Sequence, residues 1–478
     1  MRVTVIGTGY VGSVTGACLA YLGHTVTCVD TDETKIAKWN RGEAPIYEPY
    51  LEALISANSG GGSIEFTTEL SEAARQSDVI FIAVGTPPLP NGGANLIYLE
   101  TAARSIGAAM DSSRFRVVVN KSTVPVGSGN LVETLVREGI ADTHPAERNQ
   151  IRFGVASNPE FLREGCAVAD SLYPDRIVVG GSDQTTIQIM KDLYRPVTEQ
   201  SFVPPPGVPR PASLARVPLV CTTLTSAEMI KYAANAFLAM KIGFANEMAN
   251  ICERVGAEAT EVMQGIGLDS RIGSKFLNAG VGWGGSCFGK DINALLQTAY
   301  EYGYTGRLLQ ASLEVNTAQR QMVIQKLQEK LFILKGRTIG LLGLAFKPDT
   351  DDLRDAPALH IAERLIEMGA RVKVYDPIAM TACREQHPKL KIRYCDSPRH
   401  VAEDADALVI VTEWNEFRNL PLRDLAAVMT KPVLVDGRNI FQPEQAMAAG
   451  FDYTGIGRYL RFRSEQREAR REAAGSVI

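Results

Sequence analysis

The sequence has few of the residues from which metal centres and disulfide frameworks are built. It contains five histidines, at positions 24, 144, 360, 387 and 400, and no two of them lie at the spacing of zinc ligands. Its eight cysteines include no C-x-x-C pair, which argues against a disulfide framework or a zinc ribbon. We therefore expect a protein without a metal site.

Long apolar runs and an excess of positive charge are also lacking. No run approaches the roughly 18 apolar residues of a membrane helix, and the formal net charge is -4. The sequence therefore predicts no membrane span and no nucleic-acid partner. Glycines at positions 7, 9, 12 and 16 interrupt the apolar N-terminal stretch that could mimic a signal peptide, so we expect a cytoplasmic protein.

What the sequence does contain is a pattern of alternating strands and helices. Its 478 residues correspond to about three domains. Short β-branched runs alternate with helical stretches in residues 1–210 and again in 331–457, which predicts an α/β protein with two doubly wound, Rossmann-like domains built on parallel sheets. In the predicted central helical domain, 211–330, apolar residues recur at spacings of three and four over 227–255. A long helix of this kind favours a homodimer or a higher homo-oligomer.

Two stretches do not fit regular elements. The Pro-rich residues 204–218 predict a linker or a surface loop. The C-terminal tail, 458–478, has six arginines against three glutamates, which predicts a disordered, solvated end, with contact to an anionic surface as the alternative.

A dinucleotide fingerprint, G-x-G-x-x-G, occupies residues 7–12 (GTGYVG) directly after the first apolar run. We expect Gly7 to allow the tight turn, Gly9 to let a pyrophosphate approach and Gly12 to pack the helix on the strand. Asp30 ends the next apolar run, 18 residues past Gly12, where its carboxylate would bind both adenine-ribose hydroxyls and repel a 2′-phosphate. The pattern predicts NAD rather than NADP, with a purely structural glycine turn as the alternative.

The segment 282–291 (GWGGSCFGKD) is the most informative for chemistry. It places Cys287 among glycines, just before a Lys-Asp pair that opens a helical stretch. A cysteine at a helix N-terminus beside a lysine forms the nucleophilic thiolate more readily. The alternative is a small core cysteine, which is how we interpret the other seven.

Three more segments carry candidate polar groups. Lys231 and Asn235 stand four residues apart on one face of the predicted long helix, where a lysine can also simply extend into water. Thr123 follows an apolar run, at the sheet edge where doubly wound folds bind ligands, and is otherwise a turn residue. Glu160 follows another apolar run and is otherwise an ordinary solvated loop charge.

Together these segments resemble the UDP-glucose 6-dehydrogenases of the nucleotide-sugar dehydrogenase family, over about residues 1–457. Seven motifs carry the resemblance in the expected order: GTGYVG (7–12), NKSTVPVG (120–127), NPEFLREG (158–165), SAEMIKYAANAFLAMKIGFANE (226–247), GVGWGGSCFGKD (280–291), GLAFKPDTDDLRDAP (343–357) and DGRN (436–439).

The resemblance implies an N-terminal NAD domain, a central dimerisation domain and a C-terminal UDP-binding domain. It also implies a reaction, the four-electron oxidation of UDP-glucose with two NAD and water to UDP-glucuronate, which supplies surface polysaccharides. Cys287 is similar to the nucleophile that forms a thiohemiacetal and then a thioester. Lys231 and Asn235 are similar to the groups that stabilise the oxyanion, Asp291 and Thr123 to those that position a water, and Glu160 to the base for thioester hydrolysis.

Further residues match positions that bind ligands in the family. On the cofactor side these are Gly7, Gly9, Tyr10, Val11, Gly12, Asp30, Lys35, Thr86, Thr123, Glu164, Lys290 and Arg354. On the substrate side they are Glu160, Phe161, Leu162, Glu164, Lys231, Asn235, Arg271, Phe276, Gly284, Phe346, Lys347 and Arg438, with Arg271 expected to reach the sugar nucleotide of a neighbouring subunit.

Three alternatives stay open at this point. The substrate could be another nucleotide sugar, such as GDP-mannose or a UDP-N-acetylhexosamine. The chain could be a non-catalytic NAD and nucleotide sensor, although such a protein needs no nucleophile. A two-electron hydroxyacid dehydrogenase would share the first domain and the helical middle but would need neither Cys287 nor a second α/β domain. The Pro-rich stretch 204–218 is longer than the resemblance leads us to expect.

Overall fold

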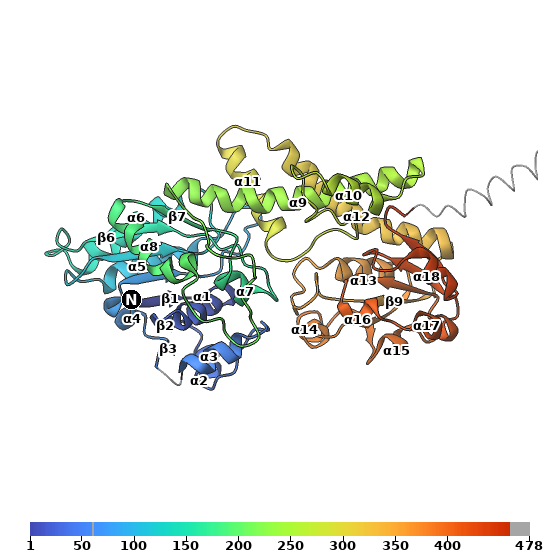
Figure 1. Cartoon of the computed structure of the whole chain (residues 1–478), viewed down its shortest axis with the longest axis horizontal. Helices are drawn as coiled ribbons and strands as arrows, with labels where there is room; N and C mark the ends of the chain where they lie inside the picture. The colour runs from blue at the N-terminus through green and yellow to red at the C-terminus, as the bar shows by residue number, and fades with distance from the viewer. Residues whose placement is uncertain (60–61, 459–478) are drawn as a thin grey trace, which may run out of the picture. The chain divides into compact units, whose positions relative to one another are not determined.

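The computed structural model describes residues 1–59 and 62–458 (Figure 1). It divides into two compact units: Met1–Asn235 with Lys290–Thr305, and Ala236–Gly289 with the chain from Gly306 onward. Each unit contains one sheet and is described by itself. The tail for which we predicted disorder lies, apart from Arg458, outside the described residues.

The first unit is built on an eight-stranded sheet in the order β3-β2-β1-β4-β5-β6-β7-β8. Strands β1 to β6 are parallel and have the order of doubly wound dinucleotide-binding folds. The prediction of an all-parallel sheet is wrong only at the pairing of β6 with β7, which is antiparallel. Strand β8 is parallel to β7 and therefore has the same reversed direction. The strands are β1 (Arg2–Ile6), β2 (Thr25–Val29), β3 (Ile64–Thr67), β4 (Val79–Ile82), β5 (Arg116–Asn120), β6 (Phe153–Ser157), β7 (Ile177–Gly181) and β8 (Leu219–Thr222).

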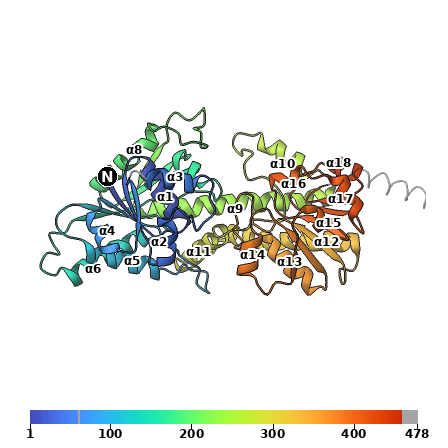
Figure 2. The ribbon, with the colours of Figure 1, turned by 90° about the horizontal axis from the view of Figure 1, so that it is seen from below.

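Both faces of this sheet are covered by helices, which explains why its strands are apolar on both sides. On one face Ile80 and Ile82 pack with α4, α5 and α6; on the other Val79 and Phe81 pack with α1, α3, α7 and α8. Figure 2 shows α4, α5 and α6 on one side of the sheet and α1, α3 and α8 on the other. The helices are α1 (Tyr10–Tyr21), α2 (Glu33–Asn40), α3 (Leu51–Ser59), α4 (Leu70–Gln76), α5 (Ile97–Ala109), α6 (Ser128–Thr143), α7 (Ala167–Leu172) and α8 (Gln184–Glu199).

The second unit contains a six-stranded, all-parallel sheet in the order β11-β10-β9-β12-β13-β14. This order repeats that of β1 to β6 in the first sheet, so the α/β prediction with two Rossmann-like domains is confirmed. The strands are β9 (Thr338–Leu342), β10 (Arg371–Tyr375), β11 (Ile392–Tyr394), β12 (Ala407–Ile410), β13 (Val433–Asp436) and β14 (Asp452–Gly455). The accompanying helices are α13 (Pro357–Glu367), α14 (Met380–Gln386), α15 (Pro398–Ala402), α16 (Asn415–Arg418), α17 (Leu422–Val428) and α18 (Pro443–Ala448).

Four helices fill the chain between the two sheets: α9 (Leu224–Val255), α10 (Ala259–Gly267), α11 (Phe288–Glu301) and α12 (Arg307–Leu331). The predicted long helix is therefore present, as the 32-residue α9. The division into units falls inside α9 and inside α11. Strand β8, which belongs to the first sheet, lies beyond the predicted boundary after residue 210; the predicted domain limits stay predictions.

The Pro-rich segment 204–218 is a surface loop docked on the first unit. It contains no helix or strand, and all of its residues lie within the described ranges. The hydroxyl of Tyr173 donates to Val208 O at 2.9 Å, and Val208 and Val217 are buried. Separately, no helix in the part of the chain that the structure describes combines the length and apolar character needed to cross a bilayer.

Candidate active site

The glycine fingerprint forms the turn between β1 and α1. Gly7 has φ +98°, and a Cβ there would stand 2.6 Å from Ala83 O, so the turn needs glycine. A Cβ on Gly12 would lie 1.8 Å from Gly7 O, whereas one on Gly9 would meet nothing within 4 Å. Gly9 is the N-cap of α1 and no side chain caps it. The turn therefore combines an open approach with an uncapped helix N-terminus, and both features fit a pyrophosphate.

Asp30 is held at the end of β2, beside the glycine turn. Its Oδ2 accepts hydrogen bonds from Thr8 N and Thr8 Oγ1, both at 2.8 Å, and its Oδ1 accepts one from Asp32 N at 3.1 Å. Burial raises the pKa of the Asp30 carboxyl, but these hydrogen bonds outweigh burial and hold that pKa below its ordinary value. Lys35 Nζ lies 3.9 Å from Asp30 Oδ2. An ionised carboxylate at this place suits ribose hydroxyls and repels a 2′-phosphate.

Thr86 and Thr123 lie at the carboxyl ends of neighbouring strands, β4 and β5. The Thr86 hydroxyl donates to Thr123 O at 2.8 Å, which fixes the two loops to each other. Doubly wound sheets bind ligands at this edge, next to the point between β1 and β4 where the strand order reverses. The two threonines therefore stand on the same sheet edge as the glycine turn and Asp30.

Glu160 and Lys231 form a buried ion pair although 71 residues separate them in sequence, with Nζ and Oε1 2.9 Å apart. Glu160 Oε2 also accepts a hydrogen bond from Leu162 N at 2.6 Å. Burial raises the pKa of Glu160, but Lys231, together with the Leu162 amide and Lys121, outweighs burial, so that pKa lies below its ordinary value. The alternatives of a solvated loop charge and of a lysine extending into water are therefore wrong.

Asn235, one turn beyond Lys231 on α9, is also buried and engaged. Its side-chain amide donates to Asp291 Oδ2 at 2.6 Å, and Lys290 Nζ lies 2.8 Å from Asp291 Oδ1. The fold thus brings two predicted pairs together within the first unit, Glu160 with Lys231 and Asn235 with Asp291. Each pair joins a cation or an amide donor to a carboxylate.

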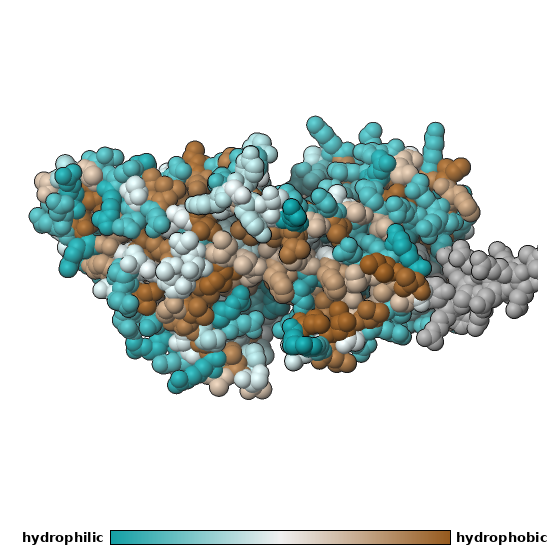
Figure 3. Space-filling view, turned by 90° about the horizontal axis from the view of Figure 1, so that it is seen from above, coloured by the Kyte–Doolittle hydropathy of each residue, from teal (hydrophilic) through white to brown (hydrophobic). Residues whose placement is uncertain are grey.

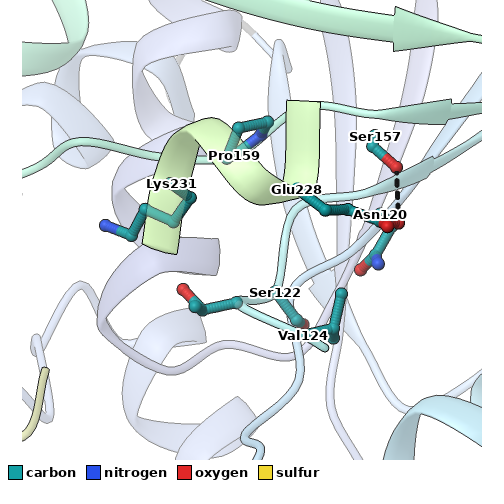
Figure 4. Close-up of a pocket in the computed structure, with 8 residues that line it drawn as sticks. Asn120, Ser122, Val124, Ser157, Pro159, Glu228 and Lys231 are labelled. Atoms are coloured by element: carbon teal, nitrogen blue, oxygen red, sulfur yellow. Dashed lines mark hydrogen bonds between the residues drawn. The ribbon is translucent and has the colours of Figure 1, made fainter. Parts of the chain in front are cut away.

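A small cavity lies at the carboxyl ends of β5 and β6, lined by residues of three predicted motifs (Figure 4). In Figure 4, Glu228 points toward Ser157, whereas Lys231 leaves the same stretch of α9 in another direction. The lining residues are Asn120, Ser122, Thr123, Val124, Ser157, Pro159, Glu228 and Lys231.

Two buried charged residues near these groups were missed by the sequence analysis. Lys121 donates to Asn158 Oδ1 at 3.0 Å, and burial lowers the pKa of Lys121 to about 8. Glu48 accepts hydrogen bonds from Gly165 N and Ala167 N, each at 2.7 Å, and from the Tyr10 hydroxyl of the glycine turn. Lys121 stands inside the NKSTVPVG motif, which was a usable signal, whereas Glu48 lies in no motif that we had singled out.

In the second unit, the cysteine segment is clamped by two side chains one turn apart on α12. Trp283 N donates to Asn316 Oδ1 at 2.8 Å, and Asn316 Nδ2 and Arg320 both donate to Trp283 O at 3.0 Å. Arg320 also forms an ion pair with Asp355. Cys287 is exposed and directly precedes α11, as predicted for a reactive cysteine at a helix start.

Most of the predicted nucleotide contacts gather at the carboxyl edge of the second sheet. Arg438 donates to Val411 O at 2.7 Å and to Gly282 O at 3.2 Å, and Lys347 Nζ lies 5.4 Å from the centre of the Phe346 ring. A Cβ on Gly284 would lie 3.0 Å from Phe346 Cβ. The backbone of the cysteine segment also contacts the segment that contains Arg354, because Gly285 N donates a hydrogen bond to Arg354 O at 2.9 Å.

The two remaining substrate candidates of the second unit are Arg271 and Phe276. Arg271 is 86% exposed, and in the described structure its guanidinium pairs with Asp269, two residues away. Phe276 has φ +63°, an uncommon value for a side-chain-bearing residue. Their predicted roles stay predictions.

The second sheet differs from the first at the position of Asp30. Asp376 follows β10 as Asp30 follows β2, but it is fully buried. Its carboxylate accepts hydrogen bonds from Leu344 N at 2.7 Å and Ala379 N at 2.8 Å, and from the Trp414 indole at 3.1 Å. Asp30 is only partly buried and accepts three hydrogen bonds from the protein, whereas Asp376 is fully buried and accepts five. Asp376 is therefore not available to a ribose, and the first sheet is the better dinucleotide site.

These features define a dinucleotide-binding protein with a second, separate Rossmann-like sheet. Three profiles of one family match the chain: the NAD binding domain over residues 1–198, the central domain over 225–318 and the UDP binding domain over 340–443. The chain belongs to the UDP-glucose/GDP-mannose dehydrogenase family. The predicted family and the NAD cofactor are thereby confirmed.

Individual relatives agree with this assignment. A UDP-glucose 6-dehydrogenase of Rhizobium meliloti is 46% identical over 462 residues, which is 96% of this chain and 100% of the relative. The structure of a UDP-glucose dehydrogenase from Pyrobaculum islandicum matches with a TM-score of 0.83 at 37% identity, covering 95% of this chain and 97% of that one. A UDP-D-ManNAc dehydrogenase from Pyrococcus horikoshii matches with a TM-score of 0.80 at 28% identity, covering 96% and 99%.

Proposed function

We propose that the chain oxidises UDP-glucose to UDP-glucuronate, with two NAD and one water consumed per sugar. The observation that carries the proposal is the buried arrangement on α9, where Lys231 pairs with Glu160 and Asn235 with Asp291. Buried ionised groups of this kind are costly to fold and are typical of catalytic sites. The names of the R. meliloti and P. islandicum relatives support UDP-glucose over other sugars.

Oxidation of a primary alcohol to an acid requires two hydride removals, and an intermediate aldehyde would otherwise escape. NAD, when bound, would accept one hydride in each oxidation. In the first oxidation the alcohol also releases its O–H proton, which gives the aldehyde. Cys287 retains the carbon between the two: its thiolate adds to the aldehyde, and the oxygen takes up a proton to give a thiohemiacetal. Loss of a second hydride and of the O–H proton leaves a thioester. Attack by water then breaks the C–S bond, which releases the thiolate and the acid.

The residues of the first unit supply the charges and hydrogen bonds for these steps. Lys231 and Asn235 stabilise the negative charge that develops on the sugar oxygen, an effect commonly worth about 3 kcal/mol per donor. Thr123 and Asp291 position the water. Glu160, which is ionised because Lys231 lowers its pKa, accepts the proton of that water.

The stoichiometry of the reaction tests this function. With purified protein, excess NAD and limiting UDP-glucose, we expect two NADH per sugar, measured by absorbance. One NADH per sugar would indicate a two-electron dehydrogenase instead. No NADH, with NAD still bound, would point to another nucleotide sugar, to be identified by product profiles with GDP-mannose and UDP-N-acetylhexosamines, or to the sensor.

We also propose that the protein is a homodimer or a higher homo-oligomer. Four large apolar side chains of α9 are exposed, and their spacings are close to whole helical turns: Phe237, Phe244, Ile251 and Val255. Hydrophobic groups are also visible on the face shown in Figure 3. An apolar stripe on a helix is normally covered by a partner, so light scattering should give a mass of at least twice 51.9 kDa. A cytosolic location is proposed on the cysteine composition and can be tested by cell fractionation.

A further inference from the structure

We propose that Glu228 is a positioning residue for the oxidation, because its buried carboxylate fixes to one another the three backbone segments that carry the catalytic side chains. The inference rests on the proposed function. Glu228 had no role in the sequence analysis, although it stands three residues before Lys231 in the SAEMIKYAANAF segment.

The carboxylate of Glu228 accepts three hydrogen bonds from two distant parts of the chain. Oε2 accepts from Gly127 N at 2.7 Å, and Oε1 accepts from Gly129 N at 2.7 Å. Oε1 also accepts from the Ser157 hydroxyl at 3.0 Å, the contact drawn in Figure 4. Because Glu228 is only 4% exposed, water cannot easily replace these partners.

Two of these bonds cap the N-terminus of α6. The N-cap residue is Gly127, with φ +97°, and no local side chain satisfies the first amides of the helix. A carboxylate from α9 does so instead, and its negative charge suits the positive end of the helix dipole. Space is tight as well, since a Cβ on Gly129 would lie 3.0 Å from Glu228 Oε1. The geometry therefore leaves little freedom for α6 to shift against α9.

Each of the joined segments leads within a few residues to a catalytic group. Thr123 lies four residues before Gly127, in the same loop between β5 and α6. Glu160 lies three residues after Ser157, and Lys231 one helical turn after Glu228. The Glu160–Lys231 ion pair is a second link between the same two segments. Glu228 and this ion pair therefore hold α9 and the end of β6 together at two points.

The charge of Glu228 is matched to its partners. All three partners are donors, so the acceptor-only, ionised carboxylate satisfies them and an amide cannot satisfy all of them. Burial raises the pKa of Glu228, and the hydrogen bonds from Gly127, Gly129 and Ser157 offset only part of that rise. Burial therefore disfavours the ionised form of Glu228, and the three donors favour it.

The first experiment replaces Glu228 by glutamine. In E228Q we expect kcat for UDP-glucose to fall by at least about tenfold, because a small displacement of catalytic groups is expensive. The dissociation constant for NAD should change much less than kcat, because the glycine turn and Asp30 lie on other segments and only Thr123 and its partner Thr86 belong to the displaced loops. E133Q is the matched control: Glu133 also lies on α6, but its carboxylate pairs with Arg137 of the same helix, whose side chain is 63% exposed. An unchanged kcat in E228Q would overturn the inference.

A double-mutant cycle separates positioning from general stability. If Glu228 acts through the turn that carries Thr123, the loss caused by E228Q should shrink to about twofold in a T123A background, whereas independent effects multiply. E133Q should show no such coupling. Full multiplication of the E228Q and T123A effects would overturn the inference. Should E228Q fail to fold, S157A, which removes only the donor at the end of β6, should show a smaller kcat loss. An unchanged kcat in S157A would then overturn the inference.

The outcome can be distinguished from a failure of the proposed function. If wild-type protein forms no NADH from UDP-glucose, the function fails. If wild-type protein is active and E228Q keeps its kcat, the function stands and the positioning role is rejected.

Discussion

Replacement of Cys287 by serine should abolish net production of UDP-glucuronate while leaving NAD binding intact. A serine hydroxyl is far less ionised than a thiol at neutral pH, so it cannot capture the aldehyde efficiently. We expect steady-state NADH formation to fall by about 10³-fold or more, as is typical when a nucleophile is removed. NAD affinity should not change, because the glycine turn and Asp30 lie in a different part of the chain. Stopped-flow absorbance and NAD titration measure the two quantities.

Cys221 provides the matched control for this experiment. The prediction of a core cysteine is wrong for Cys221, as it is for Cys166, because both are exposed like Cys287. Cys221 lies on the edge strand β8. C221S should keep full activity, and alkylation should inactivate C221S as it inactivates wild-type protein, because both keep Cys287. Full steady-state activity in C287S would rule out the covalent mechanism.

The parts of the fold that depend on local sequence could be predicted. The turn at Gly7 requires a positive φ, which glycine supplies, and the apolar runs before it and before Asp30 are short β-branched strands. The 3.6-residue period of α9 likewise needs no knowledge of the rest of the chain. The direction of a strand in the sheet could not be predicted in this way, because β7 is as apolar as β6 and its residues do not indicate that it runs antiparallel.

The environment of the catalytic groups could not be predicted, because it depends on contacts between distant residues. Glu160 and Lys231 look like a loop charge and a surface lysine until the fold puts them in one buried pair. The role of Glu228 depends on Gly127 and Gly129, about a hundred residues earlier, whose amides present no signal in the sequence. The available sequence signal was the three-residue spacing between Glu228 and Lys231, which places the two residues about one helical turn apart.

Replacement of Lys231 by methionine should reduce kcat by about 10²- to 10³-fold, because it removes the cation that stabilises the developing oxyanion. It also leaves Glu160 buried without its main counter-charge, and breaking a buried pair in this way typically costs about 3–5 kcal/mol of folding stability. K231R should recover part of both losses. K191M, on the exposed surface of α8, is the control and should behave like wild type.

The same variant should reverse the sign of the pH dependence that Glu160 contributes to stability. In wild-type protein the folded pKa of Glu160 is lowered, so its stabilising contribution is present above the ordinary pKa of glutamate and is lost as pH falls toward the folded value. In K231M burial should dominate and raise that pKa, although Lys121 still offsets part of the rise. The contribution is then present below the ordinary pKa and is lost as pH rises. Urea unfolding of both proteins between about pH 3 and 7, which spans both sides of the ordinary glutamate pKa, measures the difference. Identical pH slopes would show that the ion pair does not control the ionisation of Glu160.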